Sequence, residues 1–380
     1  MKRLRSRIQA LIQEPRPGSA GPLGWLLQAI ARAYGAVLTQ RARWYETGRL
    51  PSKRLPCGVV SVGNLTVGGT GKTPMTLWLA REFAGAGRRT AIVSRGYRGQ
   101  AEAGGGVVSD GASLLLGAAA AGDEPFMMAE HLLDTGLDVP VVVGRNRVAA
   151  GMLAVSRFAP EVILLDDAFQ HLRLRRDLNL LLLDGTAPFG NCRVLPRGPL
   201  REPLSALRRA DAVILTRSPP GTVIPRSALA KLPSGIPRFQ SQHRPIVRRR
   251  VEAPASGGNA KGSGKALFAF SGIADNADFI RSITALGFSV SGQVAFPDHY
   301  PYRPLDLSAL AAAAAASGAG AIATTEKDYA RMDRRFPWPL DLLVIGVKMD
   351  FGADEPAFRR FLKSRMDALD RNPLTEKNKH

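Results

Sequence analysis

Cysteine is scarce in this 380-residue chain, which contains only Cys57 and Cys192. Two cysteines are too few for a disulfide framework, and they lack the paired spacing of a structural zinc site. Apolar runs long enough to cross a bilayer are also absent, and no signal-peptide pattern accompanies the first apolar stretch near Gly21. We therefore expect a protein of the reducing cytoplasm that is neither exported nor membrane-spanning.

Acidic residues are few as well, because 32 Asp plus Glu stand against 52 Lys plus Arg, for a formal net charge of +20. A chain that is 45% hydrophobic and 22% charged can still bury real cores, and its length suits two or so domains. The surplus of positive charge indicates an anionic partner. Lipid, nucleic acid and polyphosphate substrates all have the required charge.

Almost half of the positive surplus lies in residues 1–54, which hold eleven Lys or Arg and two Glu. Two interpretations stay open: an amphipathic helix in the headgroup layer of an anionic membrane, or a helix docked on the protein's own core. We expect no nucleic-acid partner, because the segment has no recognisable nucleic-acid-binding motif. The apolar residues recur at three- and four-residue steps, as on one side of a helix: Leu23, Leu26, Leu27, Ile30, Tyr34, Val37 and Leu38.

Short apolar runs alternate with helical patterns after Pro56. Such alternation is typical of an α/β fold in which helices cover both faces of a parallel sheet. The predicted strands are Gly58–Val62, Thr90–Val93, Val139–Val143, Val162–Leu165, Leu178–Leu183 and Ala212–Leu215, and helices are predicted at Glu124–Leu133 and Asn146–Ser156.

A stretch rich in Gly, Ser and Ala, at Ala253–Gly264, cannot bury a core and indicates a linker. Beyond it the alternation resumes, which predicts a second, smaller α/β domain. Its predicted strands are Ala266–Phe270, Gly320–Thr324 and Leu342–Val347, and its helices Asn276–Leu286 and Ala309–Ala316. We therefore predict an N-terminal helical segment at 1–54, a first domain at 55–235, a linker at 236–264, a second domain at 265–368 and a tail at 369–380.

A glycine-rich loop between a predicted strand and helix approximates the phosphate-binding pattern G-x-x-x-x-G-K-[ST], with Thr66 in its first position. The pattern predicts a P-loop NTPase-type sheet, in which converging backbone N–H groups and the helix N-terminus bind phosphate. Lys72 would neutralise the transferred phosphate, and the Thr73 hydroxyl could ligate Mg²⁺. A turn without function is the alternative. The loop comprises Thr66, Val67, Gly68, Gly69, Thr70, Gly71, Lys72 and Thr73.

Two carboxylates, Asp166 and Asp167, follow the apolar run Val162–Leu165. The carboxyl ends of strands are where open α/β sheets bind their ligands, so one of these groups can hold Mg²⁺ beside the phosphates. We assign the metal to Asp166 and a catalytic role to Asp167. The alternative is a pair of acids that cap the following helix.

Other polar residues give weaker signals. Asp123 precedes a helical pattern and, taken alone, indicates an N-cap. His299 lies in a proline-bracketed loop, where a histidine is usually just exposed. Arg197 and Arg201 suit a phosphate or a salt bridge equally well, and Thr324–Asp328 adds polar groups at a strand end.

Taken together, the motifs resemble the tetraacyldisaccharide 4'-kinase family of lipid A biosynthesis, over about residues 24 to 350. Ala168 departs from the family pattern, where Gly is common, without touching the carboxylates. The motifs are Val62–Pro74, Ser94–Tyr97, Gly122–Pro125, Asp166–His171, Gly198–Pro203 and Phe296–Tyr300.

The resemblance implies an enzyme that transfers the γ-phosphate of ATP to the 4'-hydroxyl of an acylated glucosamine disaccharide 1-phosphate, with Mg²⁺ as cofactor. It also implies that Asp123 is the catalytic base and that His299 assists it. The expected location is the cytoplasmic face of the bacterial inner membrane, on an anionic surface. The alternative class is a nucleotide-driven switch or metal-delivery NTPase, against which stands the lack of a guanine-reading run after Ala212–Leu215.

Overall fold

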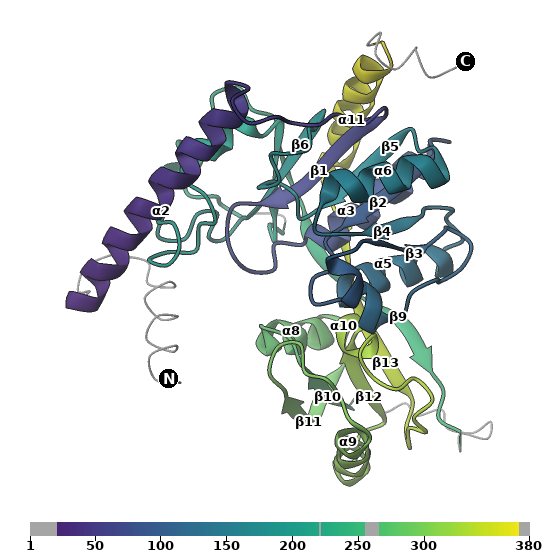
Figure 1. Ribbon diagram of the computed structural model, residues 1–380. Coiled ribbons are helices and arrows are strands. Elements are labelled where there is room, and N and C mark those ends of the chain that lie inside the picture. Colours follow the sequence, from purple (N-terminus) through teal and green to yellow (C-terminus); the bar gives the residue numbers. More distant parts are fainter. Residues whose placement is uncertain (1–20, 220–221, 255–265, 372–380) are drawn as a thin grey trace.

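Two separate sheets organise the chain in the computed structural model, which describes residues 21–219, 222–254 and 266–371 (Figure 1). The first sheet has eight strands in the order β3-β4-β2-β5-β1-β6-β7-β8, and all neighbours are parallel except β3 and β4. Its strands are β1 (Gly58–Asn64), β2 (Thr90–Ser94), β3 (Gly106–Ser109), β4 (Val141–Val143), β5 (Val162–Asp166), β6 (Leu178–Asp184), β7 (Ala212–Thr216) and β8 (Arg238–Gln240).

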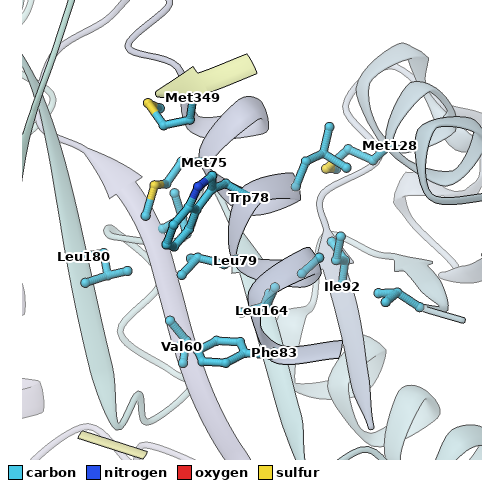
Figure 2. Close-up of a cluster of buried hydrophobic side chains, with 14 of the residues drawn as sticks. Val60, Met75, Trp78, Leu79, Phe83, Ile92, Met128, Leu164, Leu180 and Met349 are labelled. Atoms are coloured by element: carbon cyan, nitrogen blue, oxygen red, sulfur yellow. The ribbon is translucent and has the colours of Figure 1, made fainter. Parts of the chain in front are cut away.

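Helices cover both faces of this sheet, because the side chains of its strands point alternately to opposite faces. On one face, Val60 and Val62 of β1 pack with α3 (Lys72–Gly85) and α5 (Asp123–Asp134). Figure 2 shows Met75, Trp78 and Phe83 of α3 in the middle of this cluster. On the other face, Val59 packs with α6 (Arg147–Phe158). The predicted α/β fold with a parallel sheet and helices on both faces is confirmed.

The second sheet has five strands in the order β11-β10-β12-β13-β9, with β9 antiparallel to β13 and the other pairs parallel. Apolar side chains fill both of its faces, under α8 and α9. Its elements are β9 (Gln242–Val251), β10 (Ala266–Ser271), α8 (Asn276–Ala285), β11 (Ser289–Ala295), α9 (Pro304–Ala316), β12 (Ala321–Thr325), α10 (Glu326–Tyr329) and β13 (Leu342–Asp350).

Residues 236–264, which the sequence predicts to be a linker, are in fact largely structured up to Val251. Strand β8 forms the edge of the first sheet, and β9 pairs along the whole length of β13. The basic residues of β9, Arg244 and Arg248 to Arg250, hide the strand in the sequence. They are tolerated because β9 lies at the edge of the sheet. Of the glycine-rich stretch, residues 255–264 lie outside the described residues.

The final helix, α11 (Glu355–Asp370), returns to the first sheet rather than closing the second unit (Figure 1). Its Phe358, Leu362 and Met366 are buried in the same cluster as Trp78 of α3. The ring of Phe358 lies 5.3 Å from that of Trp78. The first unit is therefore built from two stretches of the chain, which the predicted range 55–235 misses. Residues 372–380 of the predicted tail lie outside the described residues.

Helix α2 (Pro22–Glu46) extends from the side of the first unit (Figure 1). One edge of the helix is buried, at Gly24, Leu27, Ala31 and Gly35. Most of the predicted apolar stripe nevertheless faces outward. The exposed side chains are Trp25, Leu26, Ile30, Tyr34, Val37 and Trp44. Within the described residues, no helix is long and apolar enough to cross a membrane.

Candidate active site

The glycine-rich loop joins β1 to α3 at the carboxyl end of the first sheet. Gly68 and Gly71 have positive φ angles of 116° and 81°, which turn the loop around the N-terminus of α3. The Thr70 hydroxyl is buried and has no hydrogen-bond partner among the described residues. A curled backbone, a helix N-terminus and a buried donor without a partner fit a phosphate ligand.

Two neighbouring segments hold the loop in place. Val67 N donates to Pro199 O (2.8 Å), and Arg201 N donates to Leu65 O (2.6 Å), so the motif at Gly198–Pro203 lies alongside the loop. On another side, a Cβ placed on Gly71 would meet His243 Nε2 of β9 at 2.1 Å. Position 71 therefore requires a glycine, because its φ angle is positive and because His243 leaves no space for a Cβ.

Asp166, the last residue of β5, is buried beside the loop. It accepts hydrogen bonds from the hydroxyls of Thr76 (3.3 Å) and Ser94 (3.1 Å). Burial raises the pKa of Asp166 to about 6, and repulsion from Glu124 and Asp167 adds to the rise. This carboxylate is ionised at neutral pH at an electrostatic cost that a bound cation would remove.

Asp167, in contrast, has cationic partners. Its carboxylate lies 3.7 Å from Lys72 Nζ and accepts a hydrogen bond from Arg201 (2.9 Å). Burial acts to raise the pKa of Asp167, but Lys72 and Arg201 more than offset this and hold it below its usual value. Neither aspartate caps the segment that follows, so the structure gives no support to the capping alternative.

The residues around the loop fit Mg²⁺, which proteins usually hold through one or two carboxylates together with substrate phosphates. Asp166 supplies a buried carboxylate with only hydroxyl partners, and Thr73 is buried in the first turn of α3. The described residues contain no group of three or more His, Cys, Asp or Glu side chains that could hold a metal without such phosphates.

Asp123 and His299, which are far apart in the sequence, are in contact. His299 Nδ1 lies 3.0 Å from Asp123 Oδ2, and their side chains are 23% and 21% exposed. Asp123 opens α5 after Gly122, whose φ of 87° brings the chain against Tyr97 O, 2.8 Å from where a Cβ would lie. The Asp123 side chain makes no capping hydrogen bond. The N-cap interpretation of Asp123 is therefore wrong.

Arg331 completes this cluster, and the sequence interpretation missed it. Its Nε donates to Asp123 Oδ2 (2.6 Å), and one of its terminal nitrogens lies 3.2 Å from His299 Nδ1. Burial acts to raise the pKa of Asp123, but hydrogen bonds from His299 and Arg331 more than offset this and lower it. The sequence offered one signal for Arg331. Asp328 and Arg331, which form an ion pair, stand three residues apart after the end of β12.

Helix α5 faces a row of cations from the second unit. Lys327 pairs with Glu124, and Arg334 donates to Glu130 (2.6 Å). Further along the helix, Asp134 accepts from Arg249 (2.6 Å). These pairs hold the second unit against the helix that begins with Asp123. No local pattern in the sequence reveals them, because each pair joins residues more than a hundred positions apart.

Comparison with known proteins places these features in a family. A family model described as "Tetraacyldisaccharide-1-P 4'-kinase" matches residues 23–367. A tetraacyldisaccharide 4'-kinase of Desulfatibacillum aliphaticivorans is 41% identical over 374 residues, which cover 96% of this chain and 99% of that protein. One from Pelobacter propionicus is 43% identical over 359 residues, covering 92% and 90%.

A solved structure is also similar. It is described as the "apo" form of LpxK from Aquifex aeolicus in complex with ATP. The TM-score is 0.71 at 32% sequence identity, and the match covers 90% of this chain and 99% of that one. The similarity therefore extends over most of the chain.

Proposed function

This chain belongs to the tetraacyldisaccharide-1-P 4'-kinase family, and from that membership we propose how its residues carry out the reaction. The chain is an ATP-dependent kinase of lipid A biosynthesis, which transfers the γ-phosphate to the 4'-hydroxyl of a tetraacylated glucosamine disaccharide 1-phosphate. The family relationship disfavours a nucleotide-driven switch or metal-delivery NTPase. The contact between Asp123 and His299 is the observation that carries the residue assignment.

The glycine-rich loop acts on the phosphate groups of ATP. Val67 N donates to Pro199 O, so within the loop Thr66–Thr73 the backbone N–H groups from Gly68 onward bind the triphosphate. Lys72 neutralises the charge that develops on the γ-phosphate. Asp167 keeps the Lys72 ammonium beside the loop through their 3.7 Å contact. Phosphoryl transfer depends mainly on positioning and charge neutralisation, so this part contributes most of the stabilisation of the transition state.

Asp166 and Thr73 would hold Mg²⁺, which supplies positive charge to the phosphate oxygens. The hydroxyls of Thr76 and Ser94 each donate to one oxygen of the Asp166 carboxylate and so fix its orientation.

Asp123 accepts the proton of the sugar hydroxyl. An aspartate is a weak base toward an alcohol, so its position relative to the acceptor matters more than its basicity. His299 orients the carboxylate from the second unit. The experiment that tests this assignment is incubation of the purified protein with Mg-ATP and the disaccharide substrate, followed by mass spectrometry to locate the new phosphate. Release of inorganic phosphate without a phosphorylated lipid would contradict the proposal.

We further propose that α2 lies on an anionic membrane surface, at the cytoplasmic face of the inner membrane. The outward side of α2 carries Trp25, Leu26 and Ile30, with exposed fractions of 74%, 57% and 46%. In the sequence, residues 1–54 hold eleven Lys or Arg against two Glu. Placing these side chains in the headgroup layer would remove their apolar surface from water while the basic residues meet anionic lipid.

Flotation with vesicles tests the membrane proposal. The double variant Leu26→Gln with Ile30→Gln should bind vesicles rich in anionic lipid at least about tenfold more weakly. The two side chains, each about half exposed, together give up about 1.5 kcal/mol or more of burial. A matched control is Leu305→Gln, which replaces a leucine that is 83% exposed on the second unit. Equal vesicle binding by the double variant and the control would contradict an interface on α2.

A further inference from the structure

Arg331 lies just after α10, at the point where the two units meet. Its side chain is 6% exposed and contacts four different groups. Nε donates to Asp123 Oδ2 (2.6 Å), and one terminal nitrogen donates both to Gly272 O (3.0 Å) and to Asp328 (3.2 Å). The other terminal nitrogen lies 3.2 Å from His299 Nδ1. The guanidinium group therefore links the first unit's aspartate to the second unit's histidine.

The second unit holds this guanidinium group firmly. Asp328 is completely buried, and its Oδ1 accepts hydrogen bonds from Gly272 N (3.0 Å) and the Tyr302 hydroxyl (3.0 Å). Its Oδ2 accepts from the Thr325 hydroxyl (2.6 Å). Gly272 O in turn accepts from His299 N (3.1 Å), so Arg331 and His299 share the same backbone support.

The two oxygens of Asp123 are not equivalent. Both the contact with His299 and the hydrogen bond from Arg331 fall on Oδ2. Within the described part of the chain, Oδ1 accepts no hydrogen bond and makes no ion pair. A carboxylate oxygen has two lone-pair sites, so Arg331 and, when its Nδ1 is protonated, His299 occupy Oδ2 and leave Oδ1 available to a substrate.

The histidine alone cannot produce this arrangement. A guanidinium group only donates hydrogen bonds, so Arg331 can bond His299 Nδ1 only when that nitrogen is unprotonated. In that tautomer His299 has no proton to donate to Asp123 through Nδ1. The hydrogen bond from Arg331 Nε to Asp123 does not depend on which nitrogen of His299 carries the proton. Arg331 is thus the partner that fixes the carboxylate whichever tautomer is present.

We propose that Arg331 is a positioning residue that holds Asp123 by Oδ2, so that Oδ1 is the oxygen that accepts the proton of the sugar hydroxyl. This inference rests on the proposed function. In the step concerned, the 4'-hydroxyl O–H bond breaks and its proton passes to Asp123 Oδ1. The sugar oxygen forms a bond to the γ-phosphorus, and the bond from that phosphorus to the bridging oxygen breaks to release ADP.

Removal of the Arg331 guanidinium group should shift the pH dependence of kcat in a predictable direction. The charged groups around Asp123 are Arg331, His299 and, on the adjoining segments, Asp298, Asp328 and the Glu124–Lys327 pair. Hydrogen bonds and charge from Arg331 help to lower the pKa of Asp123, against the effect of burial. Without Arg331 that pKa rises, so the acid limb of kcat moves to higher pH.

The test measures kcat and KM for ATP across pH, with the full chain, Mg-ATP and the detergent-dispersed disaccharide substrate. Arg331→Lys keeps a charge but loses the fork that contacts four groups. We expect kcat to fall about 100-fold, as for a misplaced catalytic group, with an unchanged KM for ATP and an acid limb at higher pH.

Added guanidinium should restore part of the turnover of Arg331→Ala. The matched control is Arg335→Lys, which alters an exposed cation on the same segment.

The outcomes separate this inference from the proposed function. If the parent protein transfers no phosphate to the lipid, the proposed function fails. If the parent is active and Arg331→Lys has the parent's kcat and pH profile, the inference alone is overturned. A loss of turnover without a pH shift, and without rescue by guanidinium, also overturns it, because that pattern indicates a purely structural role.

A second variant keeps the inference testable if the Arg331 variants fail to fold. Tyr302→Phe removes one hydroxyl from the support of Asp328 and leaves the ring packing in place. We expect a smaller loss of kcat and a smaller shift of the acid limb in the same direction. A Tyr302→Phe protein with the parent's pH profile would overturn the inference in that case.

Discussion

The phosphate-binding loop and the Asp123 cluster are built in opposite ways. The loop is a single stretch, Thr66–Thr73, whose shape follows from its glycines and from the strand and helix that it joins. The cluster combines Asp123, His299 and Arg331, which come from three separate segments of two units. A contiguous site is shaped mainly by its own unit, whereas an assembled site also requires that the units keep their relative position.

This difference separates ATP binding from transfer. The loop can bind a triphosphate with the contacts of the first unit and β9, while the base is correctly oriented only when the second unit is docked against α5. We therefore expect changes to the loop to affect ATP affinity and turnover together. Changes to the assembled cluster should reduce turnover and leave ATP affinity intact.

The largest expected effect comes from Asp123→Asn. An amide cannot accept the hydroxyl proton, so kcat should fall about 10³-fold, within the range for loss of a general base. ATP affinity, measured by equilibrium binding, should not change. Asp110→Asn, at a partly exposed loop position, serves as the control. Turnover near that of the parent would show that the loop alone is sufficient and would remove the distinction between the two sites.

Lys72→Ala should have the next largest effect, on both quantities. Loss of one positive charge at the γ-phosphate should lower kcat about 100-fold, as for removal of a single group that stabilises transition-state charge, and should also weaken ATP binding. Steady-state kinetics and ATP titration measure the two effects. Lys348→Ala, at an exposed position of β13, is the control. Unaltered ATP binding in Lys72→Ala would contradict its assignment to the loop.

Glu130→Gln sharpens the comparison at the contact between the units. It removes a forked ion pair with Arg334 and should destabilise the docked arrangement by about 1 kcal/mol or less, because Arg334 stays 30% exposed. We expect a lower melting temperature and a severalfold lower kcat at unchanged ATP affinity. Glu82→Gln is the matched control, since its partner Arg359 lies within the first unit. A loss of kcat that is equal in the control would argue against the docking role.

The smallest expected effect is the pH dependence of the Glu124–Lys327 pair. Burial acts to raise the pKa of Glu124, but Lys327 more than offsets this and lowers it. A lowered carboxyl pKa stabilises the folded state above the unfolded pKa of about 4.3, and the stabilisation is lost as pH falls through the folded value.

The difference in stability between the parent and Glu124→Gln should therefore be at most about 1 kcal/mol at pH 7 and should vanish in acid. The effect is small because solvent screens a pair whose side chains remain 38% and 36% exposed. Chemical denaturation at several pH values measures it. A difference that grows as the pH falls would contradict the assigned sign.

Contiguous features could be predicted from the sequence. The buried strands β1, β5 and β6 appear as apolar runs, and the loop between β1 and α3 appears as a glycine pattern. Strand β9 could not be recognised, because Arg244, Arg248 and Arg250 interrupt any apolar alternation. A strand at a sheet edge is stabilised by pairing with its neighbour, here β13, and that partner is nearly a hundred residues away.

The site shows the same limit. The roles of Asp123 and His299 were predicted only through resemblance to a family, since nothing in their local sequence favours catalysis over capping or exposure. Arg331 was missed because three of its four partners, Asp123, Gly272 and His299, lie far from it in the sequence. Contacts between such distant positions follow from the packing of the two units and leave no pattern in a single sequence.

The return of α11 to the first sheet has a consequence for how the chain folds as it is synthesised. Phe358, Leu362 and Met366 complete a core whose other members lie mostly before residue 240. On the ribosome, this core would remain open on one side while the entire second unit emerges. The second unit, whose sheet spans 242–350, can close first. The unit that is synthesised first is therefore the one that is finished last.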